Sequence, residues 1–151
     1  MKRKLLSVGV ALVLGAVCAA VVSAQDKPEV LVKQRQAVMT LQGKYFGPLA
    51  GMAQGKIPYN AEIVARNAAY LNVLDKMPWD GFVPGTKDAK SQAMPEVFND
   101  PAKFKAAQER LQAAVAKLVE VKSGNEAAAK AAIGEVGKAC GGCHENFRRK
   151  N

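Results

Sequence analysis

The sequence predicts an all-α protein that folds as an antiparallel four-helix bundle. Alanine is abundant, β-branched runs are scarce, and apolar residues recur at intervals of three and four positions. This spacing gives each helix one apolar stripe, and a bundle covers four such stripes at once. With 151 residues, the chain is long enough for one domain.

The N-terminus has the pattern of a secretory signal peptide. Basic Lys2–Lys4 precedes the apolar, uncharged Leu5–Val22, and small residues then lead to an expected cleavage after Ala24. We therefore predict that residues 1–24 are a cleaved signal, that residues 25–151 form the bundle, and that the mature protein resides in the periplasm.

Two alternatives explain the same segment. An uncleaved membrane anchor is the first, because the apolar stretch is about long enough to span a bilayer; the small residues at its end favour cleavage instead. Lipidation at Cys18 is the second, but Val17 stands where a lipoprotein signal normally has a small residue.

The mature chain is modestly basic. The signal contains three basic residues and no acidic ones, so its removal lowers the net charge from +9 to +6. The charges are dispersed, and no basic arm carries interleaved aromatic residues, so nucleic acid is not an expected partner. Docking to an acidic redox partner is compatible with this charge.

The first two helices are delimited by proline, glycine and a capping residue. The first begins near Pro28, a favoured first-turn residue, and Gly47-Pro48 can kink it before Gly55 and Pro58 end it. The second has Asn60 as its N-cap and stops before Pro78. The apolar positions expected to lie inside are Leu31, Val38, Leu41 and Tyr45 in the first helix, and Ile63, Val64, Tyr70, Leu71 and Leu74 in the second.

A long connection separates these two helices from the last two. Residues 77–98 are rich in proline and glycine, and we expect Trp79 to pin them to the core as a packing anchor rather than to act as a redox relay. The third helix opens at Asp100 and Pro101 as cap and first turn. The fourth runs from about residue 126 to residue 149.

The chemistry is carried by Cys140-Gly141-Gly142-Cys143-His144, a C-x-x-C-H sequence typical of c-type haem attachment. Residues three and four apart share one face of a helix, so both thiols and the imidazole project together. The thiols can add to the two vinyl groups of a haem, and His144 can then bind the iron. The glycines cost helix stability, and we expect them to ease the approach of the porphyrin edge.

Three other uses of the two cysteines are weaker. A thioredoxin-like dithiol needs a βαβ setting, a zinc site needs about four ligands, and a disulfide across so short a loop contributes little. His144 is the only histidine in the chain, and it stands where haem ligation requires it. The sixth iron position is therefore either open or occupied by a methionine, from Met39, Met52, Met77 or Met94.

A haem motif this close to the C-terminus, on the last helix of a bundle, resembles the class II cytochromes, above all the cytochrome c prime family. The segments that carry the resemblance are Arg35-Gln36 with Met39, the loop 78–86, residues 95–98 followed by Lys103-Phe104, and the tail 144–148. Phe98 and Phe147 stand where that family usually has Trp and Tyr.

The resemblance implies one covalently bound haem c and a specific set of neighbours for it. Arg35 and Gln36 would lie near the haem propionates, Met39 over the distal face, Met94 at the haem edge and Arg148 beside the imidazole. It also implies a homodimer through the first two helices.

These features favour a high-spin cytochrome, with His144 on one side of the iron and an apolar pocket under Met39 on the other. Such a site admits a small diatomic ligand such as nitric oxide, and the protein would bind it or move single electrons. We predict no enzymatic activity, because no catalytic base or nucleophile is evident. The alternatives are a low-spin electron carrier with Met39 as sixth ligand and a subunit of a redox enzyme such as a nitric oxide reductase.

Overall fold

The computed structural model describes residues 27–121 and 123–150. Its long helices are α1 (Pro28–Ala53), α2 (Ala61–Leu74), α4 (Pro101–Glu120) and α5 (Glu126–Phe147). Two short 3-10 helices, η1 (Trp79–Gly81) and η2 (Pro84–Thr86), and the four-residue helix α3 (Glu96–Asn99) lie between α2 and α4. The predicted signal segment, with Cys18, lies outside the described residues.

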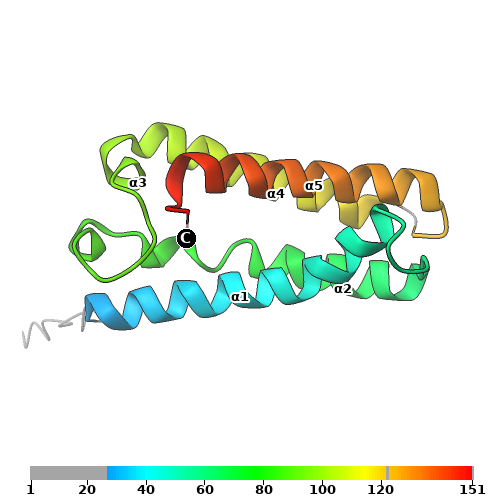
Figure 1. The fold of residues 1–151 in the computed structure, drawn as a ribbon, viewed down its shortest axis with the longest axis horizontal. Helices are drawn as coiled ribbons and strands as arrows, with labels where there is room; N and C mark the ends of the chain where they lie inside the picture. The colour runs from blue at the N-terminus through cyan, green and yellow to red at the C-terminus, as the bar shows by residue number, and fades with distance from the viewer. Residues whose placement is uncertain (1–26, 122, 151) are drawn as a thin grey trace, which may run out of the picture.

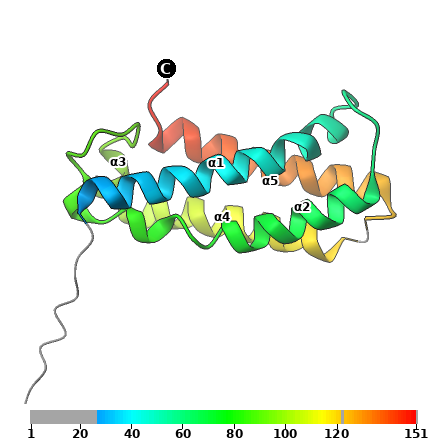
Figure 2. The same cartoon turned by 90° about the horizontal axis from the view of Figure 1, so that it is seen from below.

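The four long helices form the predicted bundle. Helices α1 and α2 make one layer and α4 and α5 the other, while α3 lies at the end of the bundle where α5 finishes (Figure 1). Seen from below, α1 and α2 run side by side, with η1 and η2 on the path toward α3 (Figure 2). The fold class is therefore confirmed.

Capping side chains set three of the four helix starts. Asn60, Asp100 and Asn125 each accept a hydrogen bond through a side-chain oxygen from the backbone N–H three residues ahead. Helix α1 instead begins at Pro28 and continues through Pro48 to Ala53. The predicted starts of all four helices are thus confirmed.

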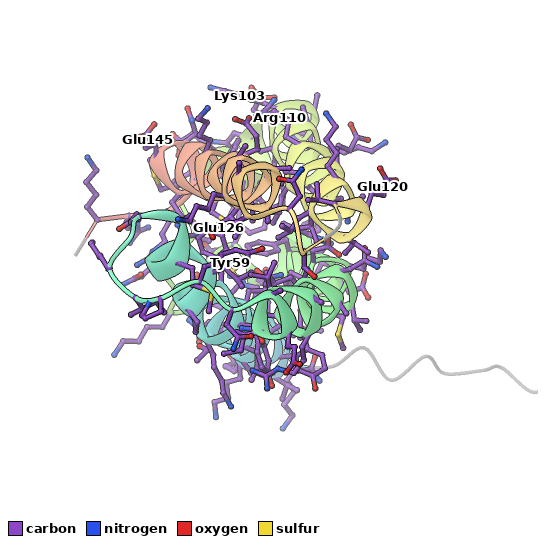
Figure 3. The ribbon with its side chains drawn as sticks, turned by 90° about the vertical axis from the view of Figure 1, so that its right-hand side faces the viewer. Tyr59, Lys103, Arg110, Glu120, Glu126 and Glu145 are labelled. Atoms are coloured by element: carbon purple, nitrogen blue, oxygen red, sulfur yellow. The ribbon has the colours of Figure 1, made fainter. Side chains whose placement is uncertain are left out.

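The end of the bundle opposite α3 is packed solid. An end-on view shows the four long helices at the corners of a square, with Tyr59 directed toward the space between them (Figure 3). The Tyr59 hydroxyl donates to the Ser123 carbonyl at 2.5 Å and ties the two connections at this end together. The apolar core here includes Leu49, Met52, Val64, Leu118 and Ile133.

Several positions differ from the predicted apolar stripes. Leu41 and Tyr70 are exposed, whereas Val32 and Arg35 are the residues that α1 buries in its first half. Helix α5 ends at Phe147, two residues earlier than expected, because the backbone that follows pairs with residues 92–94. Among the described residues, no helix is both long and apolar enough to cross a membrane.

Candidate functional site

The cysteines and the histidine of the C-x-x-C-H sequence lie in the last two turns of α5. Cys140, Cys143 and His144 all line one cavity of about 660 Å³. An added Cβ at Gly141 or Gly142 would meet no atom within 4 Å. The packing of the described chain therefore gives no reason for glycine at these two positions, which leaves room for a group bound against the helix.

The cavity lies between the two apolar clusters of the bundle. One cluster contributes Leu71, Leu111, Val115 and Val136 to its walls, and the other contributes Val97, Phe104 and Phe147. Protein interiors seldom leave space larger than a water molecule, whereas pockets for small molecules and cofactors commonly enclose 300–1,000 Å³. This space is thus of the size and character of a cofactor pocket.

Burial suppresses the reactivity of the two thiols. It raises the pKa of Cys140 to about 11 and raises the pKa of Cys143 as well, and no disulfide joins them. Reactive dithiols have a lowered thiol pKa, so this pair does not have the properties of a thioredoxin-like site. Within the described ranges, no group of three or more His, Cys, Asp and Glu is gathered as a zinc site would require.

The His144 imidazole favours its neutral form. Partial burial and the positive charge of Arg148 both lower its pKa. Neutral imidazole is the form that ligates a metal, so His144 is suited to bind iron. Arg148 follows four residues after His144, lines the same cavity and donates from Nε to the Gln92 side chain at 3.3 Å.

Three of the predicted residues of the first helix line the cavity from α1. Met39 is half-buried, Gln36 is exposed, and Arg35 is only 3% exposed. The Arg35 guanidinium donates to the Gly81 carbonyl, to Thr86 Oγ1 at 2.9 Å and to Ser91 Oγ at 3.1 Å. It also lies 4.2 Å from the centre of the Phe82 ring. Arg35 therefore anchors the loop 81–91 to α1, a role that its sequence pattern did not indicate.

Met94 is placed differently from the other predicted residues. It is half-buried and is not among the residues that line the cavity. Its backbone N–H donates to the Phe147 carbonyl at 2.9 Å, and the Arg149 N–H donates to the Gln92 carbonyl at 2.9 Å. These bonds pair residues 92–94 with the end of α5, so this segment contributes to the site mainly by holding the loop against it.

Two features of the cavity were missed by sequence reasoning. One is a chain of aromatic rings, Trp79, Phe82, Phe104 and Phe147, with centroids 5.0–6.2 Å apart. The other is Asp75, which is 1% exposed and forms part of the cavity wall. The predicted apolar pocket therefore has an ionisable group in its wall. The position of Asp75 one turn after Leu71 was the only signal available in the sequence.

The residues present fit a covalently attached haem. Two thiols three residues apart and an adjacent imidazole face a large, mostly apolar space, and buried Arg35 provides a positive charge at its edge. Thioether bonds to Cys140 and Cys143 would hold the group, and His144 would bind its iron.

The fold and the site together define a c-type cytochrome built on a four-helix bundle. The profile of the family described as Cytochrome C' matches residues 30–148. Cytochrome c' of Rubrivivax gelatinosus is 45% identical over 127 residues, covering 83% of this chain and 98% of its own. The chain belongs to the cytochrome c prime family and carries the one covalently bound haem c of that family.

Solved structures agree with this assignment. The crystal structure of the Rubrivivax gelatinosus protein has a TM-score of 0.78 at 44% identity, covering 82% of this chain and 98% of that one. A nitric oxide complex of a mutant cytochrome c prime from Alcaligenes xylosoxidans has a TM-score of 0.76 at 36% identity, covering 83% and 98%. A cytochrome c-554 of Cereibacter sphaeroides is also related, at 30% identity over 136 residues, 85% of this chain and 88% of its own.

Proposed function

We propose that this monohaem cytochrome is a high-spin protein that binds nitric oxide and exchanges single electrons with a redox partner protein. His144 would hold one side of the iron, and Met39 would cover the other without ligating it. The observation that carries this proposal is the cavity, which Met39 lines from α1 while the haem-binding residues line it from α5. The nitric oxide complex of the Alcaligenes xylosoxidans relative supports it.

The bound haem would supply an iron that cycles between its ferric and ferrous states and an open position for a diatomic ligand. The chain would exclude larger ligands through the apolar walls and the Met39 side chain. The alternative assignment gives Met39 sulfur the sixth position, which would make the protein a low-spin electron carrier.

Absorption spectra of the ferric and ferrous protein, with and without nitric oxide, test these two assignments. The matched variant is Met39→Leu, which removes the sulfur and keeps an apolar side chain of similar size. A high-spin site predicts no thioether–iron charge-transfer band and nearly unchanged spectra in Met39→Leu. A band that is present in the natural protein and lost in Met39→Leu would establish the low-spin alternative.

We propose that the protein is not an enzyme and that it takes up nitric oxide stoichiometrically. With an excess of reductant, one equivalent of nitric oxide per haem should be bound and consumption should then stop. Sustained consumption at a rate proportional to protein concentration would indicate a reductase instead.

We also propose export to the periplasm with removal of residues 1–24. The carrying observation is the charged, apolar and small-residue pattern of the N-terminus. Fractionation of bacteria that attach haem c should find the protein in the periplasm. Intact-mass measurement should give a chain that begins at Gln25 and carries one haem, whereas retention of the first residues or a lipid adduct would contradict the proposal.

A homodimer through α1 and α2 would cover an apolar surface on this layer. Leu41, Tyr70, Val73 and Met77 are all exposed there, with Val73 61% exposed, and the last three recur at helical spacing along the end of α2. Sedimentation should show a dimer that Val73→Glu converts to a monomer. Val119→Glu on α4, where the valine is 44% exposed, is the matched control and should leave the dimer intact; a Val73→Glu dimer would exclude this interface.

A further inference from the structure

Asp75 is the one acidic side chain that the described part of the chain buries. It is the C-cap residue of α2, 1% exposed, and it lies in the wall of the haem cavity. Neither of its carboxyl oxygens has a hydrogen-bond partner within residues 27–121 and 123–150. Buried carboxylates are normally paired, so an unpartnered one in a cofactor cavity calls for an explanation.

The polar groups around Asp75 bind the backbone and leave the carboxyl alone. Trp79 Nε1 and Gln112 Nε2 both donate to the Asp75 carbonyl oxygen, at 2.6 Å and 3.3 Å. Gln42 Nε2 donates to the preceding carbonyl, that of Leu74, at 2.9 Å. Because these donors come from α1, α4 and η1, the backbone of Asp75 is held from three sides. The side chain therefore stays in the wall and has no easy path into the solvent.

The electrostatic surroundings favour the protonated carboxyl. Burial raises the pKa of Asp75 to about 6, and the exposed Lys76 opposes this only in part. The neighbours that α1, α4 and η1 direct at this point, Gln42, Gln112 and Trp79, are neutral. The C-terminal end of α2 also bears partial negative charge, which disfavours a second negative charge there.

We propose that Asp75 is a redox-linked proton site: its carboxylate takes up one proton from solvent when the haem iron gains one electron, and releases it when the iron is oxidised. The electron comes from an external one-electron donor and leaves to an external acceptor, and no bond forms between Asp75 and the haem. Ferric haem has one more positive charge than ferrous haem and so stabilises the carboxylate. In a poorly screened apolar wall, that difference changes the proton affinity of the carboxyl.

This inference rests on haem in the cavity, which the family provides, and it is independent of whether Met39 ligates the iron. Proton uptake would keep the sum of the charges in the wall unchanged on reduction. The ferrous protein would thus hold no unpaired negative charge at Asp75, and its electron affinity would depend on pH in the range where Asp75 titrates.

The first test measures the reduction potential of the mature haem protein at intervals from about pH 4 to about pH 9. Between the ferric and ferrous pKa of Asp75 the potential should fall with rising pH, with a slope approaching about 59 mV per unit, the equivalent of a tenfold change for one electron. Asp75→Asn should lose this region. Asp80→Asn removes an exposed carboxyl five residues away and should retain it. The same pH profile in the natural protein and in Asp75→Asn would overturn the proposal.

The second test observes the proton directly and does not depend on a variant. Infrared difference spectra between the ferric and ferrous protein should show a protonated carboxyl band that appears on reduction. The band should shift in deuterium oxide and again when aspartate is labelled with heavy carbon at its side-chain carboxyl. A band that ignores the aspartate label belongs to another acid, such as a haem propionate, and would overturn the proposal, as would no band at all.

The two proposals fail in distinguishable ways. A protein that has normal haem spectra and binds nitric oxide, but shows no aspartate band, would reject the proton site alone. A protein with a thioether–iron band, or without nitric oxide binding, would reject the proposed function and leave the infrared result to decide the role of Asp75.

Discussion

Arg35 and Asp75 are two buried charged residues of the same cavity wall, and their surroundings are opposite. Arg35 is 3% exposed and makes three hydrogen bonds to the loop 81–91. Asp75 is buried even more completely, and its carboxyl makes none within the described chain. The first residue is fully engaged in holding the structure together, whereas the second retains its capacity to bind a proton.

The comparison shows what burial does to a charge with and without partners. The Arg35 guanidinium exchanges water for three oxygen acceptors and for the face of the Phe82 ring. The acceptors lie 46 to 56 residues away in the sequence, so one side chain fixes a long connection that has little core of its own. Asp75 has lost its water without such replacement, so its charged form is the less stable one.

Removal of Arg35 should have the largest effect on stability. Arg35→Ala should lower the free energy of unfolding by about 4 kcal/mol, because it deprives three acceptors of their donor and leaves a space beside Phe82. Urea unfolding followed by linear extrapolation measures the change. Lys33→Ala removes an exposed charge two residues away and should change stability little. A loss below about 1 kcal/mol in Arg35→Ala would mean that the loop is held by other contacts.

Neutralising Asp75 should have the opposite sign and depend on pH. Burial raises the pKa of Asp75 from an ordinary 3.8 to about 6, so the folded protein binds this proton more tightly than the unfolded chain does. Stability is therefore lost as the pH rises from about 4 through 6, and the full cost applies above that range. It amounts to about 3 kcal/mol, since each pKa unit corresponds to about 1.36 kcal/mol.

Asp75→Asn removes the titration and nearly preserves the shape of the side chain. The variant should be more stable than the natural protein at neutral pH by up to about 3 kcal/mol, with the difference fading below about pH 4. Unfolding curves at several pH values, with Asp80→Asn as the exposed counterpart, measure this difference. A gain in stability of equal size at all pH values would show that packing, rather than charge, is responsible.

Local sequence signals identified the helices and the haem-binding residues well. Asn60, Asp100 and Asn125 cap the helices that they were expected to cap, because a cap depends on neighbours only three residues away. Cys140, Cys143 and His144 come together for the same reason, since their spacing along one helix brings them to one face. These parts of the structure depend on contacts within one or two turns.

Contacts between distant segments could not be predicted in this way. The sequence of α1 placed Arg35 on the cavity face, but its partners Gly81 and Ser91 lie in a connection whose path was unknown. Gly81 itself allows the close approach, because an added Cβ would lie 2.9 Å from both the Arg35 Cβ and the Leu31 carbonyl oxygen. Asp75 was missed because nothing local distinguishes a buried helix-ending aspartate from an exposed one.

The smallest effect is expected at Thr86, which tests how the Arg35 side of the comparison is built. Thr86 is fully buried, accepts from Arg35 and donates to the Val83 carbonyl at 2.8 Å. Thr86→Val removes both bonds and should cost about 1.5 kcal/mol, whereas Thr86→Ser keeps the hydroxyl and should cost less. In the Arg35→Ala background the same change should cost about 1 kcal/mol less, which a double-mutant cycle measures. Equal costs in both backgrounds would show that Thr86 acts through Val83 alone and that the two remaining acceptors suffice to satisfy the buried guanidinium.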